Sequence, residues 1–207
     1  MDNKIFYDFI EIGTSNFNTI VEECPEDSVG LCVEPMKHYL NQLPEKKNVT
    51  KACYAIKGVG EKQKSKIHFI PEETIDRLNL PSWLKGCNTI GMASPHFARH
   101  EGVIETEEVD VISVQDLFEK YSVSGAECIK IDTEGFDMDI LRGILIYMQS
   151  EKEFQKPKWI QFEGNSIINA IHASLIRDFA EFNYDFEYLG YKNNYDSIND
   201  YLFVLNE

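Results

Sequence analysis

Short apolar runs alternate with segments of helical periodicity along most of the chain, and this alternation constrains the fold more than any other feature. Strand-like runs lie at 6–11, 29–33, 49–54, 126–132 and 158–163, and two closing runs read YDFEYLGY and DYLFVLNE. Helical patterns lie at 16–23, 36–43, 136–148 and about 169–182. This rhythm is typical of β-α units wound around a mostly parallel sheet. The closing runs have no helix between them and predict a terminal antiparallel pair.

The segment from Ile67 to Val114 interrupts the rhythm. It contains the short run IHFI, three prolines and the polar loop TIGMASPHFARHEG, followed by the run VDVISV and a helix expected at 115–121. An insertion between the third and fourth main strands is a usual place for a lid or a substrate loop, and we expect residues 71–108 to have that role. Nothing in the composition marks a domain boundary, so residues 1–207 are expected to form a single domain.

The charge balance limits the partners. The 207 residues include 20 Lys and Arg against 35 Asp and Glu, a net charge of −15 that repels phosphate backbones and anionic membranes. Nucleic acid and membranes are therefore not expected partners. The chain has neither a run of roughly 18 apolar residues nor a secretory signal. Its five cysteines form no CxxC pair, and Cys32, Cys53 and Cys128 lie in apolar runs, so we expect buried reduced thiols in a cytoplasmic protein.

Two motifs suggest a nucleoside-type site. In EIGTSN, Gly13 ends the first strand, where it permits a tight turn and a close approach by a ligand, and where a side chain would fill ligand space. Ser15 stands where a dinucleotide loop would have its second glycine, so a ligand without phosphates fits better. Glu34 ends the next strand 21 residues later, a spacing typical of a carboxylate that binds ribose hydroxyls. An ordinary turn and a solvated strand end remain alternatives.

The third motif is CIKIDTEGFDMDILRG. Its strand ends at Asp132, a Thr-Glu-Gly turn follows, and a helix begins near Phe136. Asp132 and Glu134 should emerge at the carboxyl edge of the sheet beside the first strand, which is where ligands bind in such sheets. We expect Asp132 to be buried and hence to need a partner. Asp137 and Asp139 are attributed to the favourable electrostatics of a helix N-terminus.

Five segments of the chain, taken in order, resemble the FkbM family of S-adenosylmethionine-dependent methyltransferases. They are EIGTSNFN, VEP, VISVQDLFEKYSV, IKIDTEGFDMDILRG and IQFEGN. The resemblance runs from about residue 6 to residue 205. It implies a class I methyltransferase fold, which is a Rossmann-like, doubly wound α/β fold. Such a fold has a mostly parallel seven-stranded sheet whose last strand is antiparallel. It also implies S-adenosylmethionine as the cofactor and O-methylation, the commonest activity of the family, as the expected reaction.

The resemblance further implies site residues. The cofactor-binding set is Glu11, Gly13, Thr14, Ser15, Glu34 and Ala55. In this set, residues 13–15 would contact the methionine portion, Glu34 the ribose, and Ala55 the neighbourhood of the adenine. Asp132 and Glu134 would face the methyl-transfer site. Family members often carry an N-terminal helical segment over the site, and this chain begins close to its first strand. The site is therefore expected to be open or to be closed by the insertion.

Asp132 is the first candidate to orient or deprotonate an acceptor hydroxyl, and a divalent cation beside Asp132 and Glu134 is an open alternative. His96 and His100 are four residues apart in the insertion, and one of them is a second candidate base, although both fit an ordinary polar loop. The acidic surface favours a neutral or cationic acceptor, such as a sugar hydroxyl or a small metabolite. The alternative to an enzyme is a non-catalytic methyltransferase-like fold that binds the cofactor or another protein.

Overall fold

The computed structural model describes residues 4–16, 18–90, 97, 99–163, 170–190 and 200–206. His96 lies outside the described residues, so its expected role is not addressed by the structure. Among the described helices, none is long and apolar enough to cross a bilayer. The cytoplasmic location stays a prediction.

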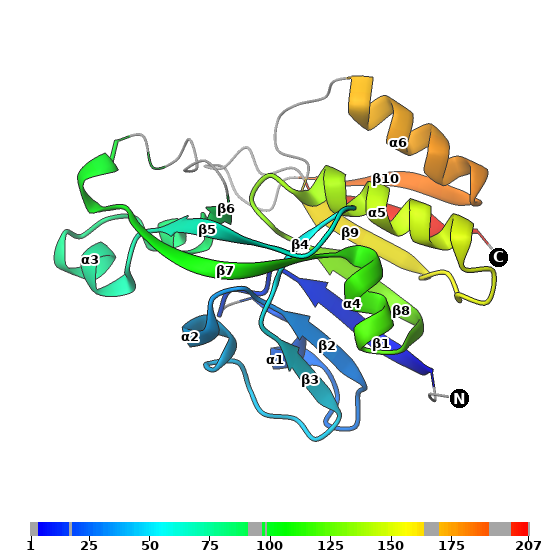
Figure 1. The fold of residues 1–207 in the computed structure, drawn as a ribbon, viewed down its shortest axis with the longest axis horizontal. Helices are drawn as coiled ribbons and strands as arrows, with labels where there is room; N and C mark the ends of the chain where they lie inside the picture. The colour runs from blue at the N-terminus through cyan, green and yellow to red at the C-terminus, as the bar shows by residue number, and fades with distance from the viewer. Residues whose placement is uncertain are drawn as a thin grey trace.

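A seven-stranded sheet forms the centre of the molecule, in the order β10-β11-β9-β8-β1-β2-β3 (Figure 1). Its strands are β1 Ile5–Ile12, β2 Gly30–Val33, β3 Val49–Ala52, β8 Val123–Ile131, β9 Trp159–Glu163, β10 Tyr184–Gly190 and β11 Asp200–Leu205. Neighbouring pairs from β3 to β9 are parallel, whereas β11 runs antiparallel to both β9 and β10. The predicted α/β fold, with a mostly parallel sheet and an antiparallel last strand, is confirmed.

Helices cover both faces of this sheet, as the doubly wound prediction requires. They are α1 Ile20–Glu23, α2 Lys37–Leu40, α4 Val114–Lys120, α5 Asp137–Ser150 and α6 Ala170–Glu181. The larger core joins β1, β8 and β9 to α4, α5 and α6, and it buries Ile140, Leu141 and Ile144, which recur along one face of α5. On the opposite face a smaller core packs Val21 and Leu40, from α1 and α2, against Phe9 and Cys32. This burial on both faces explains why the strands read as continuous apolar runs.

The expected helix at 16–23 is wrong at its start, because α1 begins only at Ile20. Gly13, Ser15 and Asn18 have φ angles of 85°, 46° and 55°. These left-handed conformations are incompatible with a right-handed helix and make the segment a loop. The residues that precede α1 therefore remain available to line a site.

The insertion contains a second sheet of four strands, two of which include most of the expected runs IHFI and VDVISV. Its order is β4-β7-β5-β6, with β4 Ala55–Lys57, β5 Gln63–Phe69, β6 Thr89–Ile90 and β7 Glu105–Ser113. Between β5 and β6 lie α3 Glu72–Arg77 and the 3-10 helix Ser82–Gly86. Apolar residues of this sheet pack against Tyr39 of α2 and against Met36, the residue before α2. The described residues within 71–108 therefore belong to a packed unit that begins earlier than expected, at Ala55, and extends to the left in Figure 1.

The expectation of buried thiols is wrong for Cys53, which is exposed, while Cys32 and Cys128 are buried. The reason is that β3 ends at Ala52, so Cys53 lies beyond the sheet, where its thiol donates to the Pro35 carbonyl at 3.4 Å.

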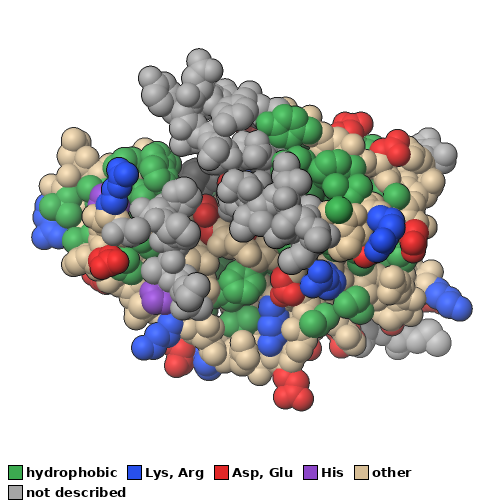
Figure 2. Space-filling model, turned by 90° about the horizontal axis from the view of Figure 1, so that it is seen from above, with side chains coloured by type: hydrophobic (Ala, Val, Ile, Leu, Met, Phe, Trp, Pro, Cys, Tyr) green, Lys and Arg blue, Asp and Glu red, His purple; other side chains and the backbone are tan. Residues whose placement is uncertain are grey.

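Exposed apolar side chains gather at two ends of the molecule, over the insertion and over the part that carries β10 (Figure 2).

Candidate active site

A cleft of about 860 Å³ lies at the carboxyl ends of the main strands. One wall comes from the loops that follow β1, β2 and β8, and the opposite wall comes from the insertion. The described lining includes five acidic residues, Glu23, Glu34, Asp132, Glu134 and Glu163, and one basic residue, Lys130. The cleft therefore favours ligands that carry positive charge and disfavours polyphosphates.

Gly13 lies where the ends of β1 and β8 meet. A Cβ atom on Gly13 would lie 1.9 Å from the carbonyl oxygen of Asp132, and the φ angle of 85° also favours glycine. The expectation that a side chain here would fill ligand space is therefore wrong, because it would collide with the neighbouring strand end. Glycine is required for the fold at this point, and the residue also lines the cleft.

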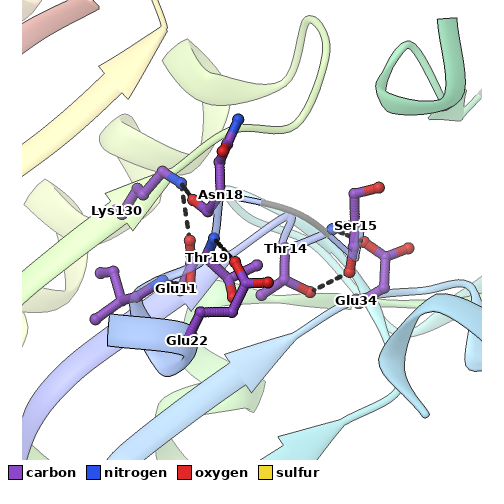
Figure 3. A network of polar contacts seen from close by, with 9 residues as sticks. Glu11, Thr14, Ser15, Asn18, Thr19, Glu22, Glu34 and Lys130 are labelled. Atoms are coloured by element: carbon purple, nitrogen blue, oxygen red, sulfur yellow. Dashed lines mark hydrogen bonds and ion pairs between the residues drawn. The ribbon is translucent and has the colours of Figure 1, made fainter. Parts of the chain in front are cut away.

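The loop after Gly13 is tied to Glu34. The Ser15 backbone N–H donates to Glu34 Oε2 at 2.8 Å, and the Thr14 hydroxyl donates to the Ser15 carbonyl at 3.2 Å (Figure 3). The Ser15 hydroxyl is itself buried and has no hydrogen-bond partner within the described residues. A buried hydroxyl without a partner is costly, so a ligand with polar groups fits at this loop.

Glu34 is 4% exposed and also accepts a hydrogen bond from the Met36 N–H at 2.9 Å. Burial raises its pKa to about 7. The alternative of a solvated strand end is therefore wrong. A buried carboxylate on the cleft wall, already oriented by two backbone donors, is suited to accept the hydrogens of vicinal hydroxyls. Ala55, the first residue of β4, lines the same cleft from the insertion side.

Glu11 differs from the other residues of the expected cofactor set, because it is fully buried and is not part of the cleft lining. Its Oε1 forms an ion pair with Lys130 Nζ at 2.8 Å, and its Oε2 accepts the Ile20 N–H at 2.8 Å (Figure 3). Glu11 therefore supports the loop and the start of α1 from beneath.

Asp132 follows the end of β8, on the same wall of the cleft as Gly13 and Glu34. The expectation that it is buried is wrong: β8 ends at Ile131, and Asp132 is exposed in the cleft. Glu134, two residues on, has a φ angle of 49°. Burial, together with the charges of Asp132 and Asp137, raises the pKa of Glu134 to about 8. Glu134 is therefore mostly protonated at neutral pH.

A third carboxylate joins this pair from β9. Asp132, Glu134 and Glu163 each offer an oxygen, and these oxygens lie within 4.8 Å of one another. Carboxylate oxygens are the usual ligands of Mg²⁺ and Ca²⁺, so the cluster has the donor type for a hard cation. The proton that Glu134 retains near neutral pH relieves the repulsion in the cluster without any ion.

Asp137 connects the loop after β8 to the end of β9. It is 3% exposed and accepts hydrogen bonds from Thr133 N, Thr133 Oγ1 and Glu163 N, at 3.0, 2.5 and 3.0 Å. Its attribution to helix-end electrostatics alone is therefore wrong, since it is a buried acceptor that fixes two strand ends. Asp139 is half-buried and accepts one such bond, from Gly58 N at 2.6 Å.

The decisive comparison is with protein families. The family model described as the methyltransferase FkbM domain matches residues 12–192, a range that includes every described strand end on the cleft wall. The chain belongs to the FkbM methyltransferase family. No curated protein matches it. Among solved structures, an O-methyltransferase from Bacillus cereus in complex with SAH is similar, with 12% identity, a TM-score of 0.42, and coverage of 96% of this chain and 73% of that one.

Within the described part of this FkbM domain, the cleft brings together Gly13, Thr14, Ser15, Glu34, Ala55, Asp132 and Glu134. His100 is half-buried and is not part of the lining. The sequence reasoning missed Lys130 and Glu163. Lys130 lies two residues before Asp132 in CIKIDTEG, and Glu163 ends the run IQFE. Neither position has a sequence spacing that indicates a cleft residue.

Replacement of Asp137 tests its structural role. Asp137→Ala leaves the backbone N–H groups of Thr133 and Glu163 without their acceptor, so we expect a loss of about 2 to 4 kcal/mol in the free energy of unfolding. Asp139→Ala, which removes a single acceptor from the same helical turn, should cost about 1 kcal/mol. Urea unfolding measures both. Equal losses for the two variants would contradict the assigned role of Asp137.

The raised pKa values of Glu34 and Glu134, about 7 and about 8 because of burial, make the stability of the protein alone depend on pH. In the unfolded chain both groups titrate near their ordinary values of roughly 4 to 4.5. The folded state therefore holds protons that the unfolded state has lost, and the free energy of unfolding falls as pH rises between about 5 and 8. We expect a loss of about 1 to 3 kcal/mol between pH 6 and pH 8 by urea unfolding. Glu134→Gln should reduce this slope, and stability that rises over the window would contradict the assignment.

Proposed function

We propose that the chain is an S-adenosylmethionine-dependent O-methyltransferase that acts on a hydroxyl of a sugar or another small metabolite. The observation that carries the proposal is that one cleft brings together the Gly13 loop, Glu34, Asp132 and Glu134, which follow the carboxyl ends of the neighbouring strands β1, β2 and β8. Membership of the FkbM methyltransferase family supports the reaction class.

The residues fit this cofactor in three respects. Glu34 offers a buried, oriented carboxylate for the ribose hydroxyls, and the Ser15 hydroxyl is a buried polar group without a partner in the described chain. Apolar residues beside Ala55, from β4 and β5, offer a surface for the adenine. The acidic lining favours a ligand with a sulfonium and an ammonium group over a nucleotide with a pyrophosphate.

The chain has two tasks in such a reaction, because the sulfonium supplies a methyl group that is already activated. It must hold the acceptor hydroxyl in line with the methyl group, and it must take up the hydroxyl proton. Asp132 is exposed at the cleft wall and is the proposed base or orienting group. Glu134 lies beside it with a pKa raised by burial to about 8, so the two carboxyl groups are suited to different roles.

A transfer assay with S-adenosylmethionine labelled in the methyl group tests the proposal. The acceptor panel contains neutral sugars, amino sugars, small hydroxylated metabolites and a polyanionic sugar phosphate. We expect label in a neutral or cationic hydroxylated acceptor and none in the sugar phosphate. Cofactor binding without transfer to any acceptor would favour a cofactor-binding module instead, and transfer to a nitrogen or sulfur nucleophile would contradict the O-methyl assignment.

A further inference from the structure

Lys130 is the cleft residue whose role the proposed function leaves open. It lies on β8, directly opposite Glu11 in the parallel register with β1. Its Nζ binds Glu11 Oε1 at 2.8 Å and also donates to the Asn18 carbonyl at 3.0 Å (Figure 3). The ammonium is therefore held by a strand neighbour and by the loop that precedes α1.

The surroundings of Lys130 give the ammonium a fixed position. Glu11 is fully buried, while the Lys130 side chain is 17% exposed. Because Glu11 also accepts the N–H of Ile20, its carboxylate cannot turn away from Lys130 without losing a buried backbone hydrogen bond. A lysine side chain is otherwise flexible, so this support places a positive charge at one defined point of the cleft.

The charge distribution of the cleft is asymmetric. Lys130 is the one Lys or Arg among the described lining residues, and it lies near Asn18, Thr19 and Gln161. The carboxylate oxygens of Asp132, Glu134 and Glu163 lie within 4.8 Å of one another, just beyond Lys130 and Gln161 at the ends of β8 and β9. A ligand that carries both signs of charge would therefore bind with its anionic group toward Lys130 and its cationic groups toward the acidic residues.

We propose that Lys130 binds the carboxylate of the amino-acid portion of the methyl donor and that Glu11 is the positioning residue that orients it. This inference rests on the proposed function, since it concerns the same ligand. The donor has one anionic group, and the ammonium of Lys130 is the matching charge in the described lining. Residues 13–15, expected to contact the methionine portion, belong to the same loop as Asn18, so the carboxylate and this loop meet at one end of the cleft.

The rival role for Lys130 is purely structural, as a support for the Asn18 loop. Two ligands separate the roles. S-adenosylhomocysteine has the amino-acid portion, whereas 5′-methylthioadenosine has the same adenine, ribose and thioether sulfur but no carboxylate. The loop also orients Glu34, the proposed ribose acceptor, through the Ser15 N–H, so a loss of loop support weakens the binding of both ligands. A loss of the carboxylate partner weakens the binding of S-adenosylhomocysteine alone.

The experiment is a calorimetric titration of the full chain with each ligand. We expect Lys130→Gln to lower the affinity for S-adenosylhomocysteine roughly 10-fold or more, which is the scale of a hydrogen bond to a charged group. The affinity for methylthioadenosine should change by less than about 2-fold. Glu11→Gln is the matched control, since it keeps the ammonium but weakens its support. It should lower S-adenosylhomocysteine affinity less than Lys130→Gln does.

Removal of Lys130 alone leaves Glu11 buried with its charge, so the double variant Glu11→Gln/Lys130→Gln provides a neutral pair in case the single variant does not fold. It should show the same selective loss. If the Lys130 variants lose affinity equally for both ligands, or lose none, the proposal is overturned. If neither ligand binds the unchanged protein, the proposed function itself fails, and this result is distinct from a loss of selectivity.

Discussion

Asp132→Asn is expected to lower turnover roughly 100-fold or more on an acceptor identified by the transfer assay, because it preserves the shape of the side chain and removes its capacity to take a proton. Asp132 is exposed in the cleft, beyond the end of β8. The affinity for S-adenosylhomocysteine should change little. Steady-state rates and calorimetry on the same preparation measure the two quantities separately.

Asp139→Asn is a matched control for this result, since it changes a carboxylate of the same segment that is not part of the cleft lining. Treatment with EDTA then separates two ways in which Asp132 can act. We expect full activity after chelation, as a direct base requires, whereas loss of activity that Mg²⁺ restores would assign the acidic cluster to a cation. Wild-type turnover in Asp132→Asn would contradict the role of Asp132 and make His96 or His100 the next base to test.

Glu34→Ala is expected to weaken binding of both S-adenosylmethionine and S-adenosylhomocysteine by about 1.5 to 3 kcal/mol, the range for hydrogen bonds to a charged group. The reason is that Glu34 is a buried carboxylate of the cleft lining, is oriented by the N–H groups of Ser15 and Met36, and is the proposed acceptor for the ribose hydroxyls. Loss of this acceptor should also loosen the Ser15 loop. Calorimetric titration of the variant gives the change directly.

Asp116→Ala is a suitable control for Glu34→Ala. Asp116 also accepts a backbone hydrogen bond, from Ser113 N at 3.1 Å at the start of α4, but it is not part of the cleft lining. It should lower the stability of the chain and leave cofactor affinity unchanged. An affinity for Glu34→Ala equal to that of the unchanged protein would remove Glu34 from the binding site.

The main sheet could be predicted from the sequence because its strands are buried on both faces. The burial of β2 is complete, so GLCV reads as a continuous apolar run, and the periodic apolar stripe of α5 identifies a helix of more than three turns. These are local signals that survive without knowledge of the tertiary structure. The position of Glu34 followed from the same logic, since it directly succeeds such a run.

The insertion sheet gave a weaker signal, because the runs IHFI and VDVISV marked only parts of β5 and β7 and did not predict a separate sheet. In β5 only Ile67 is buried, and Lys64 instead forms ion pairs across the sheet with Asp110 and Glu108 of β7. Strands that are stabilised by pairing with residues far along the chain, and by charges on an exposed face, have weak local patterns. The short strands β4 and β6 were missed for the same reason.

The errors within the site concern burial and partners. The sequence cannot show that β8 ends at Ile131. Because the strand ends there, the Asp132 carboxylate lies beyond the strand and is exposed in the cleft. Nor can the sequence show that Asp137 turns inward to bind the backbone of Glu163, 26 residues away. The pairing of Glu11 with Lys130, 119 residues apart, depends on the register of β1 and β8, which only the folded sheet determines.

The most direct test of the account is a calorimetric titration of the purified, unchanged chain with S-adenosylhomocysteine and, separately, with NAD⁺. The account predicts saturable binding of S-adenosylhomocysteine at one molecule per chain and no binding of NAD⁺. The cleft has a carboxylate for ribose, but its acidic lining and its Gly13 loop offer no site for a pyrophosphate. Absence of S-adenosylhomocysteine binding under conditions in which the chain is folded, or binding of NAD⁺ in its place, would contradict it.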